Sequence, residues 1–225
     1  MKTRRIRKQI LILQYDDRPI TEDYRKLMAR NKQYAKLHGY EYKFVRSGKK
    51  DIPPYWRKVE LVKELLPRYK GVLWVDTDAV VFNMKFPLEK ITRSSHMFYK
   101  SQDNWRVPNH HFNAGVWLIK NTPEMNSLMD DWSKLYNNDD WLQNAKDKWH
   151  TTGKWSNTTY EQGSFIDHIQ PKYKKYIKRL PCNIFQGCLE DINTKNEPFI
   201  IHFMSRLKEH IPGFIKTFID MPEKA

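Results

Sequence analysis

The sequence predicts an α/β domain built on a mostly parallel sheet. In the first half, short apolar runs alternate with stretches in which apolar residues recur every three or four positions, which is the pattern of strands followed by helices. The continuous apolar run 71–75 is typical of a central strand buried on both faces. A length of 225 residues and a hydrophobic content of 40% suit one well-packed domain, which we expect to span 1–225.

The first predicted elements are a strand at Gln9–Gln14 and the helix that follows it. Thr21 is a suitable N-cap for this helix, because its hydroxyl can accept a hydrogen bond from a free N–H group of the first turn. Apolar residues then recur at helical spacing from Tyr24 to His38. Gly39 fits the helix end, where glycine commonly adopts the left-handed conformation.

A second strand is expected at Glu41–Val45, followed by a polar loop that runs through Pro54. The next helix places apolar residues at every third or fourth position from Trp56 to Leu66. It should stop at Pro67, because proline lacks the N–H group that continues a helix.

Further strands are predicted at Met97–Tyr99, Phe112–Ile119 and Phe199–Phe203, where apolar residues cluster. Between the last two, Thr122 and Pro123 are expected to cap and open a helix.

Two segments of the second half are less regular. Residues 137–159 are polar, lack a sustained period and contain three tryptophans, so we interpret them as a long loop beside the active site. Tyr160–Ile169 looks helical and is expected to stop before Pro171.

The charge is strongly positive, with 40 Lys and Arg residues against 26 Asp and Glu, a formal net charge of +14. Such a field favours nucleic acid, an acidic membrane surface or a phosphorylated small molecule, but a merely solvated surface has the same composition. Two cysteines lack the spacing of a zinc site. The N-terminal apolar run Ile10–Leu13 is too short for a signal peptide or a membrane span. We therefore expect no transmembrane span and a cytoplasmic location.

Asp76 and Asp78 directly follow the predicted central strand. Alternate residues of an extended chain point the same way, so these carboxylates converge where ligands of open α/β sheets bind. Converging carboxylates repel each other unless a cation or a proton lies between them. Oxygen ligands of this kind suit Mg²⁺ or Mn²⁺ and leave positions for substrate phosphates. The alternative is two acids that cap a surface turn.

His202 closes the predicted last strand. A single histidine among apolar residues is often a hydrogen-bonded core residue, but it becomes a candidate ligand if its strand ends near the two aspartates. A nitrogen ligand favours Mn²⁺ over Mg²⁺. Arg206, Lys208 and His210 follow as cations that could meet a diphosphate, or as plain surface charge.

Two further segments offer polar groups suited to a sugar. Asn113 precedes Ala114 and Gly115, whose small side chains allow a close approach to the backbone. Glu161 and Gln162 stand at a predicted helix start. The structural alternatives are a β-bulge and ordinary helix-start residues.

Five segments occur in the order found in one enzyme family: Asn31–Tyr40, Trp56–Lys58, Trp74–Val81, Phe112–Ile119 and His202–Phe203. Over nearly its whole length the chain resembles the yeast-type galactosyl- and mannosyltransferases, which are grouped with the plant xyloglucan xylosyltransferases. It is also similar to small glycosyltransferases encoded by large algal DNA viruses.

The resemblance implies a GT-A fold, a single Rossmann-like domain with a mixed, mostly parallel sheet flanked by helices. Asp76 and Asp78 match the family's Asp-x-Asp motif, and His202 matches its C-terminal metal-ligand histidine. Tyr15 and Asp16 match the region that cups the nucleotide base.

The resemblance also assigns the sugar side of the site. Lys58 lies where a helix faces the donor. Asn113, Ala114 and Gly115 would line the sugar pocket. Glu161 and Gln162 match an Asp-Gln pair that contacts the transferred sugar, although Glu replaces the commoner Asp. The chain lacks the membrane anchor of the Golgi enzymes, which indicates a cytoplasmic enzyme, in the host cytoplasm if viral, or a trimmed domain.

We therefore expect a Mn²⁺- or Mg²⁺-dependent glycosyltransferase that moves a sugar to a glycan, a glycoprotein or another hydroxyl acceptor. Family analogy favours a UDP-sugar donor over a GDP-sugar and implies retention at the anomeric carbon. Asp78, Glu161 and Lys208 are the expected catalytic residues, with Arg206 beside the donor phosphates. An inverting route would need a base, for which Asp103 and Glu161 are the candidates.

Two rival functions are less well supported by the sequence. A nucleotidyltransferase that makes nucleotide sugars also uses metal-binding acids, but a glycine-rich phosphate loop is lacking near the first strand. A basic nucleic-acid-binding module would fit the charge, yet the sequence has no recognition motif. We expect no nucleic-acid partner.

Overall fold

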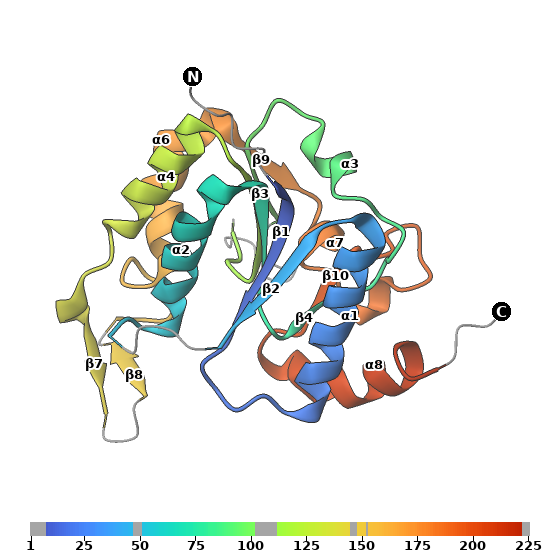
Figure 1. The fold of residues 1–225 in the computed structure, drawn as a ribbon. Coiled ribbons are helices and arrows are strands. Elements are labelled where there is room, and N and C mark those ends of the chain that lie inside the picture. The colour runs from blue at the N-terminus through green and yellow to red at the C-terminus, as the bar shows by residue number, and fades with distance from the viewer. Residues whose placement is uncertain (1–7, 47–50, 102–111, 145–147, 152, 222–225) are drawn as a thin grey trace.

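A mixed sheet forms the centre of the computed structural model, which describes residues 8–46, 51–101, 112–144, 148–151 and 153–221 (Figure 1). Within these residues the sheet has six strands in the order β2-β1-β3-β6-β5-β9. The strands are β1 (Lys8–Tyr15), β2 (Glu41–Val45), β3 (Tyr69–Val75), β5 (Phe98–Ser101), β6 (Val116–Lys120) and β9 (Ile177–Leu180). β6 runs antiparallel to both neighbours, and the other pairs are parallel. The predicted mixed, mostly parallel sheet is confirmed.

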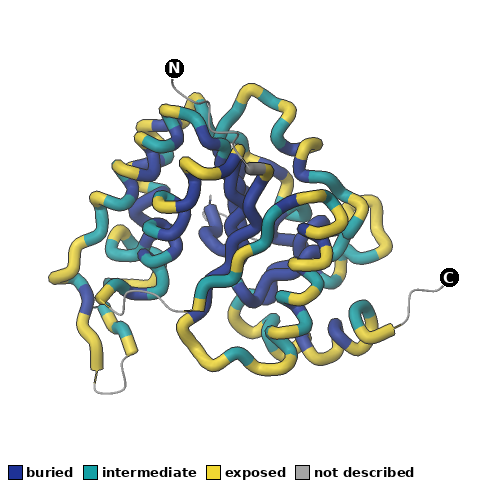
Figure 2. Tube along the Cα trace, viewed as in Figure 1, coloured by how far each residue is buried: buried dark blue, intermediate teal, exposed yellow. Residues whose placement is uncertain are grey.

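Helices cover both faces of this sheet (Figure 1). On one face lie α2 (Pro54–Leu65) and α4 (Pro123–Ser133), and on the other α1 (Glu22–His38). The helix α8 (Ile211–Phe218) packs against α1 and the β4–β10 strand pair. Side chains of β1 alternate between the two sides of the sheet, because successive residues of a strand point to opposite faces. Leu11 and Leu13 pack with α2, whereas Ile10 and Ile12 pack with α1. The central strands are accordingly buried along most of their length (Figure 2).

Two small sheets lie beside the main one among the described residues. β4 (Ala79–Val81) pairs antiparallel with β10 (Ile200–His202), and β7 (Trp141–Gln143) with β8 (Trp149–Thr151). Short helical segments make up the rest: η1 (Leu66–Arg68), α3 (Glu89–Thr92), η2 (Asn138–Asp140), α5 (Glu161–Ser164), η3 (Phe165–Ile169), α6 (Gln170–Tyr173), η4 (Lys174–Tyr176), α7 (Cys182–Phe185), η5 (Leu189–Asp191) and η6 (Ser205–His210). Within the described ranges, no helix combines the length and apolarity needed to cross a membrane.

The predicted starts of α1 and α4 and the predicted end of α1 are confirmed by their caps. The Thr21 hydroxyl accepts a hydrogen bond from the N–H of Tyr24, and Thr122 does the same for Met125. Gly39 has φ of 70°, the left-handed conformation, and its N–H donates to the last carbonyls of α1.

The predicted strand Phe112–Ile119 was too long, because β6 begins only at Val116. The Asn113 side chain accepts a hydrogen bond from the N–H of Gly115 at 2.8 Å, and the N–H of Ala114 donates to Gln162 at 2.9 Å. These two N–H groups are therefore bonded to side chains and cannot join the sheet ladder. The result is a turn that faces the site instead of a strand.

Two predictions for the second half were also wrong in part. Residues 137–159 are not all loop, since β7 and β8 form a hairpin whose strands are too short to show a period. The helix from Glu161 does not stop before Pro171 but continues through α6. A proline ring clashes with the carbonyl four residues earlier in a regular α-helix. Here the wider π-helical turn η3 precedes Pro171 and changes that spacing.

Candidate active site at the carboxyl edge of the sheet

A cavity of about 710 Å³ opens where β1 and β3 end and antiparallel β6 begins. This is the edge at which open α/β sheets bind ligands. The cavity wall includes nearly all of the predicted site residues: Tyr15, Asp16, Lys58, Asp76, Asp78, Asn113, Ala114, Gly115, Glu161, Gln162, His202 and Lys208. Arg206 is exposed and is not among the lining residues, and Asp103 lies outside the described residues.

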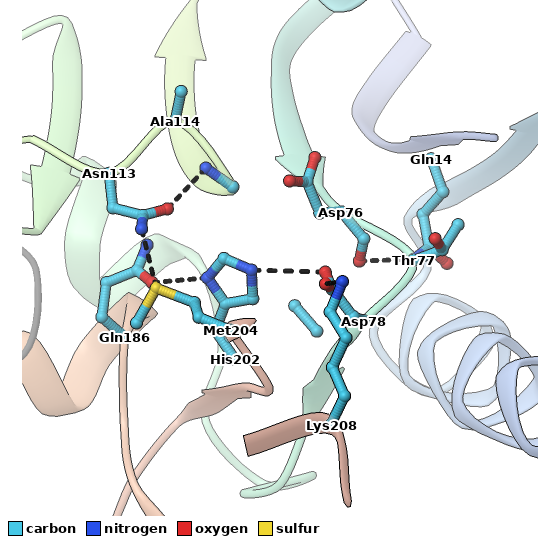
Figure 3. A network of polar contacts seen from close by, with 12 residues as sticks. Gln14, Asp76, Thr77, Asp78, Asn113, Ala114, Gln186, His202, Met204 and Lys208 are labelled. Carbon is cyan, nitrogen blue, oxygen red and sulfur yellow. Dashed lines mark hydrogen bonds and ion pairs between the residues drawn. The ribbon is translucent and has the colours of Figure 1, made fainter. Parts of the chain in front are cut away.

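Asp76, Asp78 and His202 meet at this edge (Figure 3). Each offers one ligand atom, and these atoms all lie within 4.8 Å of one another. The β4–β10 ladder brings the distant histidine to the acids, because His202 pairs with Ala79 and the N–H of Phe203 donates to the carbonyl of Asp78 at 2.9 Å. Two carboxylates and an imidazole are a donor set that suits Mn²⁺.

His202 is oriented by Gln186, a fully buried residue that follows α7. Nδ1 of the ring lies 2.7 Å from Oε1 of Gln186, and Nε2 lies 3.3 Å from Oδ1 of Asp78. With the amide oxygen assigned to the ring, Nδ1 carries a hydrogen and Nε2 faces the Asp78 carboxylate. A proton between Nε2 and the carboxylate makes this contact a hydrogen bond, and a divalent ion could take the place of that proton. The arrangement therefore fits a divalent ion held by Nε2.

Each acid also has a lysine partner. Lys208 Nζ lies 2.9 Å from Asp78, and Lys58 Nζ lies 3.2 Å from Asp76, which also accepts a hydrogen bond from the Trp74 indole at 2.7 Å. Burial alone would raise the pKa of the Asp78 carboxyl, but the hydrogen bond from His202 and the charge of Lys208 outweigh it and hold that pKa well below its usual range. Asp78 is therefore ionised, as a metal ligand must be.

Lys58 lies at the centre of a buried charge cluster. Its ammonium contacts Asp76, the Glu161 carboxylate at 3.1 Å and the Ala114 carbonyl at 3.2 Å. Burial raises the pKa of Glu161, and the nearby charge of Lys58 only partly opposes this effect. Burial would lower the pKa of Lys58, but the two acids outweigh it and raise that pKa. Removing Lys58 would leave Glu161 buried without its partner.

Sequence reasoning missed Arg18, which lines the same cavity from beyond β1. Asp16 accepts hydrogen bonds from the Arg18 guanidinium at 2.8 and 2.7 Å and from the Thr77 hydroxyl at 2.6 Å. Burial would raise the pKa of Asp16, but these bonds outweigh it and lower that pKa. Asp16 thus fixes a cation at the cavity wall. The sequence did offer a signal for it, an arginine two residues after Asp16, the acid that follows the first strand.

The opposite wall is a hydrogen-bonded chain of neutral groups. The Gln162 side chain accepts from the N–H of Ala114 and donates to the Ser156 hydroxyl at 3.1 Å. Gly115 lies against the His202 ring, since a Cβ there would come within 2.1 Å of the ring carbon Cε1. Ser156 and Trp155 also line the cavity, and no periodic pattern in the sequence could have singled them out.

Comparisons with known proteins agree with this geometry. Residues 8–104 match the sequence model of the galactosyl transferase GMA12/MNN10 family. The chain is 26% identical to the probable alpha-1,2-galactosyltransferase gmh1 of Schizosaccharomyces pombe over 44% of its own length and 40% of that protein. It is 29% identical to glycosyltransferase 6 of Arabidopsis thaliana over 45% of its length and 26% of that protein. The chain thus spans less than half the length of these relatives.

Among solved structures, the fold is similar to a glycosyltransferase involved in the glycosylation of the major capsid of PBCV-1. The two chains superpose with a TM-score of 0.69 over 92% of this chain and 98% of the other, at 15% sequence identity. The resemblance to the yeast-type galactosyltransferases predicted from the sequence is thereby confirmed, and the chain has the GT-A glycosyltransferase fold.

Proposed function

We propose that this chain is a divalent-metal-dependent glycosyltransferase that moves a sugar from a nucleotide-diphosphate donor to a hydroxyl acceptor. One observation carries the proposal: the ligand atoms of Asp76, Asp78 and His202 lie within 4.8 Å of one another on the wall of a cavity of about 710 Å³. Nucleotidyltransferase and nucleic-acid-binding functions give no comparable reason for an imidazole to join two acids there.

The donor's diphosphate would lie beside the acid–histidine cluster. A Mn²⁺ or Mg²⁺ ion held by Asp76, Asp78 and His202 supplies Lewis-acid stabilisation of the charge on the departing nucleotide. Lys208 reaches the same place from η6, and its ammonium can donate to the phosphates. Arg18 offers a second fixed cation at the wall. A UDP-sugar is favoured by family analogy, with Tyr15 and Asp16 on the side of the base.

The transferred sugar would lie against the neutral wall formed by Asn113, Ala114, Gly115 and Gln162. Glu161 enters this wall as a buried carboxylate held 3.1 Å from Lys58. In that position it can accept a hydrogen bond from a sugar hydroxyl while Lys58 keeps its charge balanced. Retention at the anomeric carbon follows from the family resemblance alone.

The test is a panel of nucleotide sugars with Mn²⁺, read as release of the nucleoside diphosphate. We expect a UDP-sugar to be turned over by the native chain, and chelation of the metal to stop the reaction. Asp78→Ala should lower turnover by about 10³-fold, the range seen when one group that stabilises transition-state charge is lost. Asp139→Ala removes an exposed acid away from the cavity and serves as the matched control.

Several outcomes would contradict the proposal. Native turnover by Asp78→Ala would exclude the metal site. Release of pyrophosphate from a nucleoside triphosphate and a sugar phosphate would favour the nucleotidyltransferase. A salt-sensitive gel shift without any effect of Mn²⁺ would favour nucleic-acid binding.

A further inference from the structure

An exposed tryptophan stands on the cavity wall, in the segment between β8 and α5. Trp155 is 67% exposed, although most large apolar side chains of the described residues are buried. An exposed indole gains little from burial and therefore contributes little to folding stability. Trp155 also lines the cavity that holds the acid–histidine cluster. A large aromatic surface kept open at a binding cavity indicates contact with a ligand.

Two aromatic rings contact Trp155 and a third packs on both of them, which makes an aromatic cluster of Tyr55, Trp141, Trp155 and Tyr160. The Trp155 ring lies 5.5 Å from Tyr55 and 4.9 Å from Tyr160, both in edge contacts. Trp141, which is buried, packs on Tyr55 and Tyr160 from β7. Two tyrosine rings thus contact the indole while two thirds of the Trp155 surface stays open.

The backbone around Trp155 is constrained to keep it there. Ser156 has φ of 62°, a left-handed conformation that is strained for a residue other than glycine. Gly163 lets this loop pack onto the start of α5, because a Cβ at that position would lie 2.0 Å from the carbonyl oxygen of Asn157. The Trp56 indole donates to the carbonyl of Thr159 at 2.8 Å and ties the loop to α2. The strain and these contacts together fix an exposed ring.

We propose that Trp155 is the stacking platform for the acceptor, and that the acceptor is a neutral saccharide. A pyranose ring has an apolar C–H face that packs on an aromatic face, where the ring's negative quadrupole attracts C–H hydrogens. Its hydroxyls can hydrogen-bond to neutral polar groups, and the Ser156 hydroxyl stands beside the platform on the cavity wall. The inference rests on the proposed function.

The position of the platform argues for the acceptor rather than the donor base. Ser156, the next residue, is bonded to Gln162, which is bonded to Ala114 in the turn before β6. Tyr55 stands one helical turn before Lys58, the partner of Glu161. Both links lead to the predicted pocket of the transferred sugar, which the acceptor must adjoin to receive that sugar. The nucleotide base is expected elsewhere, beyond β1 at Tyr15 and Asp16.

The test uses neutral oligosaccharides of galactose, mannose, glucose and xylose. At least one should stimulate release of UDP from the donor by the native chain. Trp155→Ala should raise the KM for that saccharide about tenfold or more, as truncation of a tryptophan hot spot does, and the donor KM by less than about twofold. Trp155→Phe should recover part of the loss. Leu142→Ala, an equally exposed apolar residue on β7 outside the cavity, should change neither KM.

Saturation-transfer NMR on the same saccharides, without donor, separates this inference from the proposed function. Saccharide binding that Trp155→Ala abolishes, in a chain that releases no UDP, would support the platform and contradict the transferase. Mn²⁺-dependent release of UDP with no saccharide bound or used would overturn the platform. A Trp155→Ala effect confined to the donor KM would reassign Trp155 to the nucleotide base.

Discussion

Gly115 is a residue whose missing side chain makes room for a candidate metal ligand. Its α-carbon faces the His202 ring, and a Cβ there would lie 2.1 Å from Cε1 and 2.8 Å from Nε2. Gly115→Ala must therefore displace the imidazole, although every ligand atom is retained. We expect the Mn²⁺ concentration for half-maximal activity to rise by about 10- to 100-fold, as when other groups that orient a metal ligand are changed.

The measurement is a Mn²⁺ titration of UDP release, with thermal unfolding of the variant to show that it folds. Gly213→Ala is the control, because a Cβ at that exposed position of α8 meets no atom within 4 Å. It should leave the titration unchanged and raise stability by up to about 1 kcal/mol, since alanine favours the helix. An unaltered Mn²⁺ titration in Gly115→Ala would remove His202 from the metal site.

Lys100 makes the pH dependence of stability testable at one residue. This β5 lysine is 4% exposed, its amine donates to Gln170, and it lies 5.6 Å from the centre of the Phe112 ring. Burial, with a smaller contribution from the charge of Arg179, lowers the pKa of Lys100 to about 8. Below that pH the folded protein must hold a buried ammonium, which opposes folding.

Between pH 8 and the ordinary lysine pKa of about 10.4, the unfolded chain therefore binds more protons than the folded one. The contribution of Lys100 to the free energy of unfolding rises with pH across that window. Lys100→Met removes the effect. We expect denaturant unfolding to show the variant gaining on the native chain at pH 7, with the difference shrinking by up to about 3 kcal/mol by pH 10. Lys36→Met, at an exposed position, is the control and should show the same pH dependence as the native chain. If the free energy of unfolding of Lys100→Met runs parallel to that of the native chain from pH 7 to pH 10, the prediction is wrong.

At the scale of elements, one buried side chain replaces a missing strand. β4 pairs with β10 on one edge, and on its other edge the Asn31 amide donates to the Ala79 carbonyl at 2.9 Å and accepts from the Val81 N–H at 2.8 Å. From its place on α1, the Asn31 side chain thus makes the two hydrogen bonds that a neighbouring strand would make with β4. Because β4 follows Asp78 directly, this amide also helps to hold the end of the acid pair.

Asn31→Leu should leave both backbone groups of β4 buried without partners. Each costs about 1–3 kcal/mol, so the free energy of unfolding should fall by about 2–6 kcal/mol. Denaturant unfolding measures the loss, and Gln33→Leu on the exposed side of α1 is the control. A loss below about 1 kcal/mol would mean that water or a shifted helix satisfies the two groups.

Element by element, local chemistry predicted the boundaries that depend on local interactions. The Thr21 and Thr122 caps and the Gly39 helix end need only neighbouring residues, and the sequence predicted them correctly. The turn at 112–115 depends on Gln162, which is distant in sequence, so it was mistaken for strand. β4 and β10 support each other across more than a hundred residues, and the pairing of β4 could not be inferred from its three residues alone.

At the scale of the whole molecule, the sequence could name the two acids of the site because they follow a buried strand. It could not bring His202 to them without the family resemblance, since only the β4–β10 ladder fixes that distance. Arg18 and Trp155 escaped prediction because their role depends on the wall they share, not on spacing. The lysines opposite Asp76 and Asp78 were also unforeseen as ion-pair partners, and they bear on how metal and donor bind together.

Lys208 Nζ lies 2.9 Å from one oxygen of Asp78, and the lysine side chain is 39% exposed and therefore able to move. A metal ion that binds alone must compete with this ammonium. A diphosphate gives Lys208 a new partner, so each ligand should improve the binding of the other, by the same factor in both directions. We therefore expect Mn²⁺ and UDP together to raise the unfolding temperature more than the sum of their separate effects. For scale, one ligand at about 100 times its dissociation constant stabilises the folded protein by about 2.7 kcal/mol. This corresponds to roughly 5–10 °C in unfolding temperature for a chain of this size.

Lys208→Ala tests the cause of this coupling by thermal shift and by titration calorimetry of Mn²⁺. Loss of the competing ammonium should tighten Mn²⁺ binding to the variant without UDP, whereas loss of the phosphate contact should weaken UDP binding and remove the excess shift. A mutation that merely damaged the site would weaken both ligands. Lys216→Ala, an exposed lysine of α8, should behave as the native chain does. If Lys208→Ala weakens Mn²⁺ binding as much as UDP binding, Lys208 supports the acid pair instead of competing for it, and the coupling must arise elsewhere.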